Sequence, residues 1–333
     1  MTGTVRTVLL AAAATLALAP PALAQDPVPT PTPTPPAPTP APAPAAAKLR
    51  IAVKTPYRDG RRRLALRGDK VAVTGSLKPY VAGQKVAVRV LSGGKRLPSG
   101  RSVTVKPGGT FTVHLRPRRT GSLAIQATHA ATPGQGSART AKIRVLVARP
   151  SLGFGSRGTL TRIFQRKLQG LHYAAYVTGR FDDRTGRAVM AWRKVNRRAR
   201  VYTADAGVVR GVLAGRGGWK VRHPHAGHHV EADISLQALA LIDGKRVVHV
   251  YHTSSGAPAT PTVLGHYRFY SKTAGTNAKG MVDSNYFIRG YAIHGYVDVP
   301  PYNASHGCLR VPIPDARTIY DWIRLGDEIF VEP

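Results

Sequence analysis

The sequence has almost no cysteine: Cys308 is the single one among 333 residues. One cysteine excludes an internal disulfide. None lies near the N-terminus, which excludes a lipid anchor at a cleavage site there. In an exported protein an unpaired thiol meets an oxidising compartment, so a retained thiol favours a chemical role. The alternative is that Cys308 is a small buried hydrophobe.

Acidic residues are also scarce, with 16 Asp and Glu against 49 Lys and Arg and a net charge of +33. In a cytosolic protein this surplus would indicate nucleic-acid binding. The basic residues are spread over the folded regions without an aromatic stacking pattern, and the N-terminus predicts export, so we exclude nucleic acid as a partner. Two interpretations stay open: an arginine-rich solvated surface, or attraction to anionic cell-wall polymers.

Long hydrophobic runs are missing after the N-terminus. There, Arg6 precedes an apolar run over residues 8–19 and a small-x-small sequence at residues 22–24. This pattern predicts a signal peptide over residues 1–24, cleaved before Gln25. The run is shorter than the roughly 20 residues of a membrane span. We therefore expect an exported protein of the cell wall or periplasm, without a stable membrane span, that is tethered to the membrane if the signal is uncleaved.

Proline occupies nearly every second position from residue 27 to residue 44. Such spacing favours polyproline II and prevents a packed core, so residues 25–47 are predicted to be a Pro/Thr/Ala-rich disordered linker. Close to 290 residues follow, enough for two or three domains. The predicted fold is multidomain.

Residues 48–149 alternate apolar with polar or small side chains, which is the period of half-buried strands. Glycine-rich turns separate the strands, and the pattern predicts an immunoglobulin-like β-sandwich without the Cys and Trp hallmarks of antibody domains. No residue here indicates catalysis, so a spacer or adhesion role is expected. The alternation is clearest at Val71–Val73, Val86–Val90, Phe111–Leu115, Leu123–Ala127 and Ile143–Val147.

Residues 150–218 change to helical spacing, as at Leu160, Ile163 and Leu168. Several short sequences resemble the peptidoglycan-binding domain family, which implies a small three-helix bundle. A plain helical linker is the alternative. The matching sequences are Gly158-Thr159-Leu160, Leu168-Gln169 and Gly179-Arg180-Phe181-Asp182.

Two sequence patterns are similar to cofactor-binding or metal-binding motifs. Residues 153–158 form a literal G-x-G-x-x-G, but Arg149-Pro150 interrupts the preceding strand and no parallel βαβ unit follows, so we reject a dinucleotide site. A histidine cluster has no cysteine beside it to complete a zinc site, although Glu231 and Asp233 lie close in sequence. We expect no metal and no cofactor. The histidines are His223, His225, His228 and His229.

Residues 219–333 return to strands. Asp243-Gly244 between two apolar runs is a strong hairpin signal. One helix is expected near the C-terminus, with Asp315 as its N-cap. The nucleophile candidate Cys308 lies in a loop, in the sequence Ser-His-Gly-Cys-Leu-Arg of residues 305–310.

Two histidines near Cys308 offer a base for its thiol. An unperturbed thiol has a pKa near ~8.5 and is only a few per cent ionised at neutral pH, so an imidazole base makes it a strong nucleophile. The residue types alone therefore predict an acyl-transfer enzyme with Cys308 as nucleophile and His294 or His306 as base.

The segments His294-Gly295, residues 305–310 and Asp315 together resemble the signature of L,D-transpeptidases of the YkuD type, and the similarity spans most of residues 229–333. The resemblance implies a mostly-β catalytic domain that acts on peptidoglycan stem peptides. Such enzymes cleave the bond between the third residue and the following D-alanine through a thioester, which an amine of a second stem captures. The gap between His294 and Ser305 is shorter than in many members.

The resemblance also implies roles for single residues. Cys308 attacks the carbonyl, and His294 takes the thiol proton. The carbonyl of Gly295 or a nearby group fixes the tautomer of His294, and Gly307 and Cys308 form an oxyanion hole with their N–H groups. Two interpretations of Arg310 stay open: pairing with a substrate carboxylate, or bracing the turn. His306 and Ser305 are expected to shape the loop.

Other functions remain open. Water in place of the amine would make the protein an L,D-carboxypeptidase, and an inactive site would make it a non-catalytic cell-wall-binding protein. A sortase-like enzyme is disfavoured, because its His, Cys and Arg come from separate strands. We expect a monomer, and we expect a chain starting near Trp219 to process soluble stem peptides as fast as the full chain.

Overall fold

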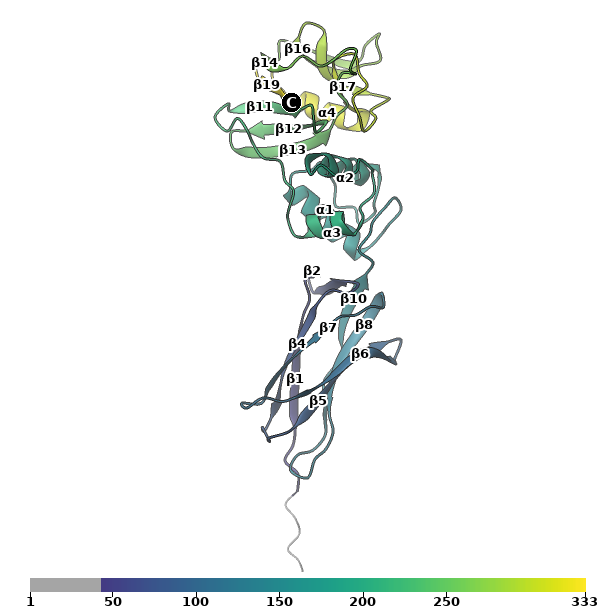
Figure 1. The fold of residues 1–333 in the computed structure, drawn as a ribbon, viewed down its shortest axis with the longest axis vertical. Coiled ribbons are helices and arrows are strands. Elements are labelled where there is room, and N and C mark those ends of the chain that lie inside the picture. Colours follow the sequence, from purple (N-terminus) through teal and green to yellow (C-terminus); the bar gives the residue numbers. More distant parts are fainter. Residues whose placement is uncertain (1–42) are drawn as a thin grey trace, which may run out of the picture. The chain divides into compact units, whose positions relative to one another are not determined.

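The computed structural model describes residues 43–333 (Figure 1). The predicted signal peptide and most of the predicted linker lie outside these residues. Residues 44–333 form one compact unit. Within residues 43–333, no helix has the length and apolar character to cross a bilayer.

Two sheets make up the region that follows the predicted linker. A three-stranded antiparallel sheet has the order β1-β4-β7, and a seven-stranded sheet has the order β2-β3-β10-β8-β5-β6 with β9 on β8. The strands are β1 Lys48–Lys54, β2 Tyr57–Asp59, β3 Arg62–Leu66, β4 Val71–Lys78, β5 Lys85–Ser92, β6 Lys95–Thr104, β7 Thr110–Leu115, β8 Gly121–His129, β9 Ala138–Arg139 and β10 Ile143–Ala148.

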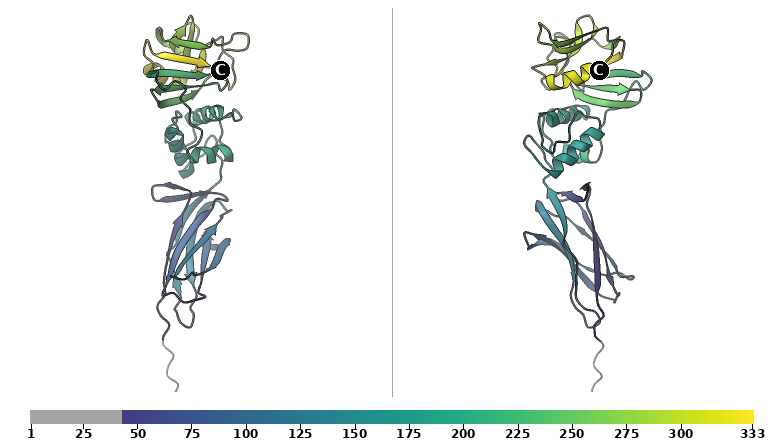
Figure 2. Two further views of the ribbon diagram at one scale, coloured as in Figure 1. Left: turned by 60° about the vertical axis from the view of Figure 1, so that its left-hand side comes forward. Right: turned by 180° about the vertical axis from the view of Figure 1, so that it is seen from behind.

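The inner faces of these two sheets share one hydrophobic core. Val73 and Phe111 from the smaller sheet lie in the same cluster as Val88 and Leu123 from the larger one. In β5, β7 and β8 buried residues alternate with more exposed ones, as the period of two requires. The predicted two-layer arrangement is therefore present (Figure 2), while its immunoglobulin-like character remains a prediction. We call residues 44–149 the sandwich.

Three helices follow: α1 Thr159–Gly170, α2 Asp183–Val195 and α3 Ala206–Leu213. Asp182 caps α2 by accepting a hydrogen bond from the Thr185 N–H at 2.8 Å, and Asp205 caps α3 in the same way. The glycine-rich segment over 153–158 is a turn that leads into α1, and α1 leads to α2 rather than to a parallel strand. This fits the rejection of a dinucleotide site.

The C-terminal region contains two further sheets and one helix. The five-stranded sheet has the order β13-β12-β11-β19-β14, and the four-stranded sheet has the order β15-β16-β17-β18. The predicted hairpin is the β12–β13 pair. The elements are β11 His228–Asp233, β12 Ala238–Asp243, β13 Arg246–His252, β14 Gly265–Arg268, β15 Ser271–Thr276, β16 Val282–Ile288, β17 Tyr291–Tyr296, β18 Leu309–Pro312, α4 Ile313–Trp322 and β19 Glu328–Glu332.

The five-stranded sheet is covered on both faces. One face packs with Ile293 and Leu309 of the four-stranded sheet in a common core. The other face contributes Ala240, Ile242 and Val250 to a core that it shares with the three helices. This double coverage explains why the first five residues of β12, Ala-Leu-Ala-Leu-Ile, are all buried instead of alternating.

Helix α4 begins earlier than predicted. It starts at Ile313 with Pro312 in the N-cap position, so the expectation that Asp315 is the N-cap was wrong. The carboxylate of Asp315 is instead buried and accepts two hydrogen bonds from Arg187 of α2, at 2.8 and 3.1 Å. Pro314 in the first turn of α4 has no N–H that needs a capping partner, and Asp315 forms this long-range ion pair.

Candidate active site

Cys308 and His294 are brought together by two parallel strands. In the β17–β18 ladder Ile293 pairs with Leu309, and His294 pairs with Arg310. Ile293 and Leu309 point into the core. Successive side chains of a strand point to opposite faces, so His294 and Cys308 both lie on the other face, diagonally across adjacent strands. The two residues predicted to act as nucleophile and base therefore share one surface.

His294 is buried, with 3% of its surface exposed. Its Nδ1 lies 2.9 Å from the carbonyl oxygen of Gly295. Because a carbonyl only accepts, Nδ1 carries the proton and Nε2 is left with a free lone pair. Burial lowers the pKa of His294 below its ordinary value. The imidazole is thus neutral near pH 7 and able to accept a proton through Nε2.

The thiol of Cys308 is half-buried. Burial raises the pKa of Cys308, and the nearby N–H of Ala292 offsets part of this rise. The sulfur lies 3.8 Å from the carbonyl oxygen of Gly290, which can accept its proton in a weak hydrogen bond. The two groups on this face are therefore a neutral thiol and a neutral imidazole.

Ser305 organises the loop before Cys308. Its hydroxyl donates to the carbonyl of Cys308 at 2.6 Å and accepts the N–H of Gly307 at 3.1 Å. The Gly307 N–H is thus bonded within the loop. The contribution of the Gly307 and Cys308 N–H groups to an oxyanion hole stays a prediction.

Gly307 is required by shape. Its φ of 112° lies in a region that side chains rarely adopt, and a Cβ here would come within 2.3 Å of the Tyr291 ring. The turn brings the chain back into β18 directly after the loop. Only glycine fits at this position.

A second segment holds the cysteine loop in place. The N–H of Ala257 and the hydroxyl of Thr260 donate to the carbonyl of Ser305 at 2.8 and 3.0 Å. The hydroxyl of Thr262 donates to the carbonyl of Gly307 at 2.8 Å. These three residues lie in one short segment, residues 257–262. Their contribution is to fix the backbone around Cys308.

The remaining predicted residues have different surroundings. Gly295 packs against α4, where a Cβ would come within 2.7 Å of Ala316. The guanidinium of Arg310 lies 4.2 Å from the centre of the Tyr296 ring, a cation–π contact on the same face as His294. His306 is exposed. The geometry ranks His294 above His306 as the base, because only His294 is buried with a fixed tautomer.

This geometry agrees with a comparison against protein families. Residues 227–331 match the YkuD family, the L,D-transpeptidase catalytic domain. The resemblance drawn from the motifs is confirmed for these residues, which we call the YkuD region. Both Cys308 and His294 lie inside it.

Solved structures of L,D-transpeptidases are similar to this chain. One from Xylanimonas cellulosilytica is 27% identical with a TM-score of 0.51, covering 54% of this chain and 97% of its own. L,D-transpeptidase 1 of Mycobacterium tuberculosis is 21% identical with a TM-score of 0.27, over 32% of this chain and 62% of its own. An Enterococcus faecium L,D-transpeptidase is 22% identical with a TM-score of 0.29, over 38% and 61%. A comparison with curated proteins gave no match.

Sequence reasoning missed a buried lysine that reaches the YkuD region from α2. Lys194 is 1% exposed, and its Nζ donates to the carbonyl of Thr253 at 2.7 Å. The Thr253 hydroxyl in turn donates to the carbonyl of Arg310 on β18 at 2.7 Å. Burial, with a smaller effect of Arg200, lowers the pKa of Lys194 to about 6. The strand after Cys308 is thus supported from outside the YkuD region.

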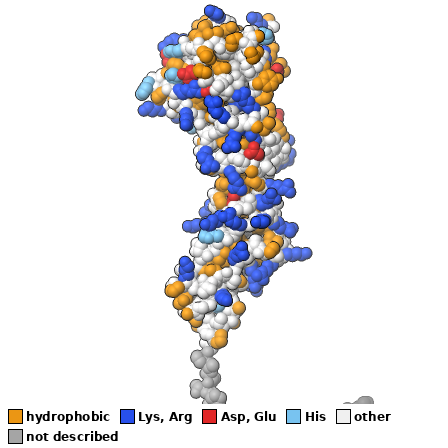
Figure 3. Space-filling view, in the orientation of Figure 1, with side chains coloured by type: hydrophobic (Ala, Val, Ile, Leu, Met, Phe, Trp, Pro, Cys, Tyr) orange, Lys and Arg blue, Asp and Glu red, His pale blue; other side chains and the backbone are white. Residues whose placement is uncertain are grey.

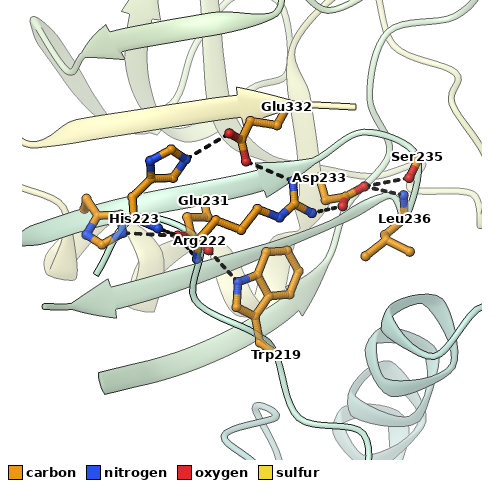
Figure 4. A network of polar contacts seen from close by, with 9 residues as sticks. Trp219, Arg222, His223, Glu231, Asp233, Ser235, Leu236 and Glu332 are labelled. Atoms are coloured by element: carbon orange, nitrogen blue, oxygen red, sulfur yellow. Dashed lines mark hydrogen bonds and ion pairs between the residues drawn. The ribbon is translucent and has the colours of Figure 1, made fainter. Parts of the chain in front are cut away.

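The histidine cluster lies elsewhere, and three of its four members contact carboxylates. His223 contacts Glu332 at 2.9 Å and stacks on Phe330, and His228 contacts Asp327 at 2.7 Å. Figure 4 shows Glu231, which accepts from the Trp219 indole and the N–H groups of Arg222 and His223, all at 2.7 Å. In residues 43–333 no three His, Cys, Asp or Glu side chains are grouped to hold a metal. His223 and His228 thus connect the start of β11, and the segment before it, to β19 and the residue before β19.

Proposed function

We propose that this protein is a cysteine-dependent L,D-transpeptidase that cross-links or remodels peptidoglycan stem peptides. The YkuD match supports the reaction class. The observation that carries the chemistry is the shared face of Cys308 and His294, with His294 fixed in the Nδ1–H tautomer. The substrate follows from the family resemblance.

The proposed reaction has two halves. His294 Nε2 accepts the thiol proton as Cys308 sulfur attacks the carbonyl of the third stem residue, and the Cys308 N–H stabilises the oxyanion. The imidazolium then protonates the leaving amine, D-alanine departs, and a thioester remains. In the second half His294 takes a proton from the amine of another stem, which attacks the thioester and releases the thiol. The product is a new amide between two stems.

Neutral resting groups suit this mechanism. A thiol with a raised pKa stays protonated and resists oxidation outside the cell, since the thiolate is the reactive form. A buried imidazole with a lowered pKa remains an acceptor at mildly acidic pH. The predicted signal peptide places this chemistry in the wall or periplasm, where stem peptides are found.

There are two alternative functions. They differ from the proposal in the acceptor of the thioester or in whether a thioester forms at all. An L,D-carboxypeptidase uses water in the second half of the same reaction. A non-catalytic wall-binding protein forms no thioester. The ordered His294 tautomer and the hydrogen-bonded loop around Cys308 favour an enzyme over the second alternative.

The decisive experiment is intact-mass spectrometry of the full chain mixed with a stem tetrapeptide. We expect the protein to gain the mass of the tetrapeptide less D-alanine, and Cys308→Ala to gain none. Cross-linked dimers among the products identify a transpeptidase, and tripeptide alone identifies a carboxypeptidase. Turnover by Cys308→Ala would overturn the cysteine mechanism, and a wild-type chain without adduct or turnover would favour the non-catalytic alternative.

A further inference from the structure

The positive charge of the chain is concentrated in the sandwich. Residues 48–149 hold 23 Lys and Arg against two acidic residues, which gives +21 of the total of +33. On the face shown in Figure 3, Lys and Arg are spread over the sandwich and Asp and Glu are nearly absent from it. A surplus this large creates a strong attractive field for anions.

Both acidic residues of the sandwich already have partners. Asp59 pairs with Arg166 at 2.7 Å, and Asp69 pairs with Arg210 at 2.5 Å, each arginine belonging to the helical region. Within residues 44–149, the sandwich's own cations therefore have no carboxylate left to neutralise them. Their counter-charge must come from a ligand or from salt.

A hollow on the outer face of the seven-stranded sheet gathers three of these cations. A row of residues in register crosses four strands: Ser102 on β6, Ala87 on β5, Thr128 on β8 and Arg139 on β9. The first three side chains are small, so they form a low floor. Lys85 and Arg89 stand on either side of Ala87 along β5. The resulting cavity has a volume of about 460 Å³.

One polar atom at this cavity lacks a partner. Nε of Arg89 is buried without a hydrogen bond within the described chain. His129 follows Thr128 on β8 and so points to the other face of the sheet, and its Nδ1 lies 2.9 Å from the carbonyl oxygen of Lys85. Buried donors and acceptors without partners are costly, so a ligand that supplies oxygen atoms would bind here with a gain.

We propose that this cavity, the sandwich anion site, binds phosphate groups of a phosphodiester polymer. Its donors approach from several strands, which suits a tetrahedral oxyanion better than a planar carboxylate; the hydroxyls of Ser102 and Thr128 add to them. Lys85 and Arg89 lie four residues apart on one strand, about 13 Å. One small anion does not span that distance, whereas a chain of phosphates does. The site is independent of the chemistry at Cys308.

The test measures binding of a defined-length inorganic polyphosphate to the full chain by calorimetry over a range of salt concentrations. We expect Arg89→Gln to weaken binding about tenfold or more, because a charge-assisted contact is lost, and to lower the salt dependence. Arg89→Lys keeps the charge without the bidentate geometry and is expected to lose less. The matched control is Arg61→Gln, which removes the same charge from an exposed turn and is expected to change affinity less than twofold.

A second variant tests the site without removing a side chain that the fold could need. Ser102→Glu places a carboxylate on the exposed cavity floor without removing any cation, and we expect a loss of at least tenfold with an unchanged melting temperature. Equal losses in Arg61→Gln and Arg89→Gln would overturn the proposal in favour of a diffuse charge effect. Poly-glutamate of equal charge that binds as tightly, and depends equally on Arg89, would overturn the assignment to phosphate.

Discussion

The sandwich and the YkuD region use charge in opposite ways. The YkuD region, residues 227–331, contains nine Lys and Arg and nine acidic residues, whereas residues 48–149 contain 23 and two. In the YkuD region the charges are matched internally, as in the pairing of Arg268 with Glu328 at 2.6 Å. The sandwich lacks such internal partners. Matched charges are neutralised within the chain, while unmatched charges are available to a ligand.

The largest expected effect comes from cutting the chain between the helices and the YkuD region. A chain of residues 219–333 would expose Ile242 and Val250, and each buried aliphatic side chain contributes about 1.5–3 kcal/mol. With the other residues of that face, the loss is several kcal/mol out of a typical total of about 5–15. We expect a chain starting at residue 150 to remain folded and to acylate, and one starting at 219 to melt far lower.

Thermal unfolding followed by circular dichroism, with acylation assays on both chains, checks this. The result would revise the expectation from sequence that a chain starting near Trp219 suffices. Equal melting temperatures of the two chains would show that the shared core is dispensable.

The second prediction compares acylation, which is proposed for the YkuD region, with polyphosphate binding, which is proposed for the sandwich. His294→Ala removes the proton acceptor and is expected to slow acylation by about 10²-fold or more. His306→Ala, at an exposed position, is the control and should cost far less. Polyphosphate affinity should be the same in both variants. Stopped-flow acylation rates decide the ranking, and a larger loss in His306→Ala would reverse it.

Acylation by the wild-type chain should also persist on the acid side of pH 6.5. Burial lowers the pKa of His294, so the neutral base form is present at lower pH than for a free imidazole. A pH–rate profile of acylation measures this acid limb. A midpoint above pH 6.5 would contradict the buried neutral imidazole.

A smaller effect concerns Lys194. Its pKa of about 6 lies below the ordinary 10.5. Between those values the unfolded chain binds one more proton than the folded chain, so stability rises with pH through this window. Lys194→Met should remove that slope, which is at most about 1.4 kcal/mol per pH unit. Urea unfolding of both proteins between pH 6.5 and 9 measures it, and parallel curves would show that Lys194 titrates normally.

The smallest effect is expected for a matched charge. Arg268 forms an exposed pair with Glu328 at 2.6 Å. Arg268→Gln should change the free energy of unfolding by less than about 1 kcal/mol and leave polyphosphate affinity within twofold. Calorimetry beside the Arg89→Gln measurement sharpens the contrast between the two regions. A tenfold loss of polyphosphate affinity in Arg268→Gln would mean that affinity depends on total charge and not on the position of the charge in the chain.

Much of the site was predictable from local sequence. The motif around Cys308 and the pair His294-Gly295 point to the proposed reacting groups, because their chemistry depends on residue type and short spacing. The hairpin at Asp243-Gly244 and the strand alternation in the sandwich follow from equally local rules.

The features that could not be predicted from the sequence depend on contacts between residues far apart in the chain. Lys194 lies in an amphipathic helix, where a lysine normally faces solvent, and nothing nearby indicates that β13 covers it. From the sequence, Asp315 resembles a capping residue. In the structure its carboxylate pairs with Arg187, which lies 128 positions earlier. The unbroken apolar run of β12 was the one available sign that a second layer covers its sheet.

The hydrogen bonds that hold the cysteine loop have a consequence for folding order. Ser305 and Gly307 are bonded by Ala257, Thr260 and Thr262, some 45 residues earlier in the chain. Contacts of such sequence separation form after local ones, because closing the intervening loop costs entropy. The backbone that would orient Cys308 toward a substrate is therefore completed only once this earlier segment has docked. On the proposed mechanism, a nascent or partly folded chain would carry an ordinary cysteine, and its activity would begin only at the end of folding.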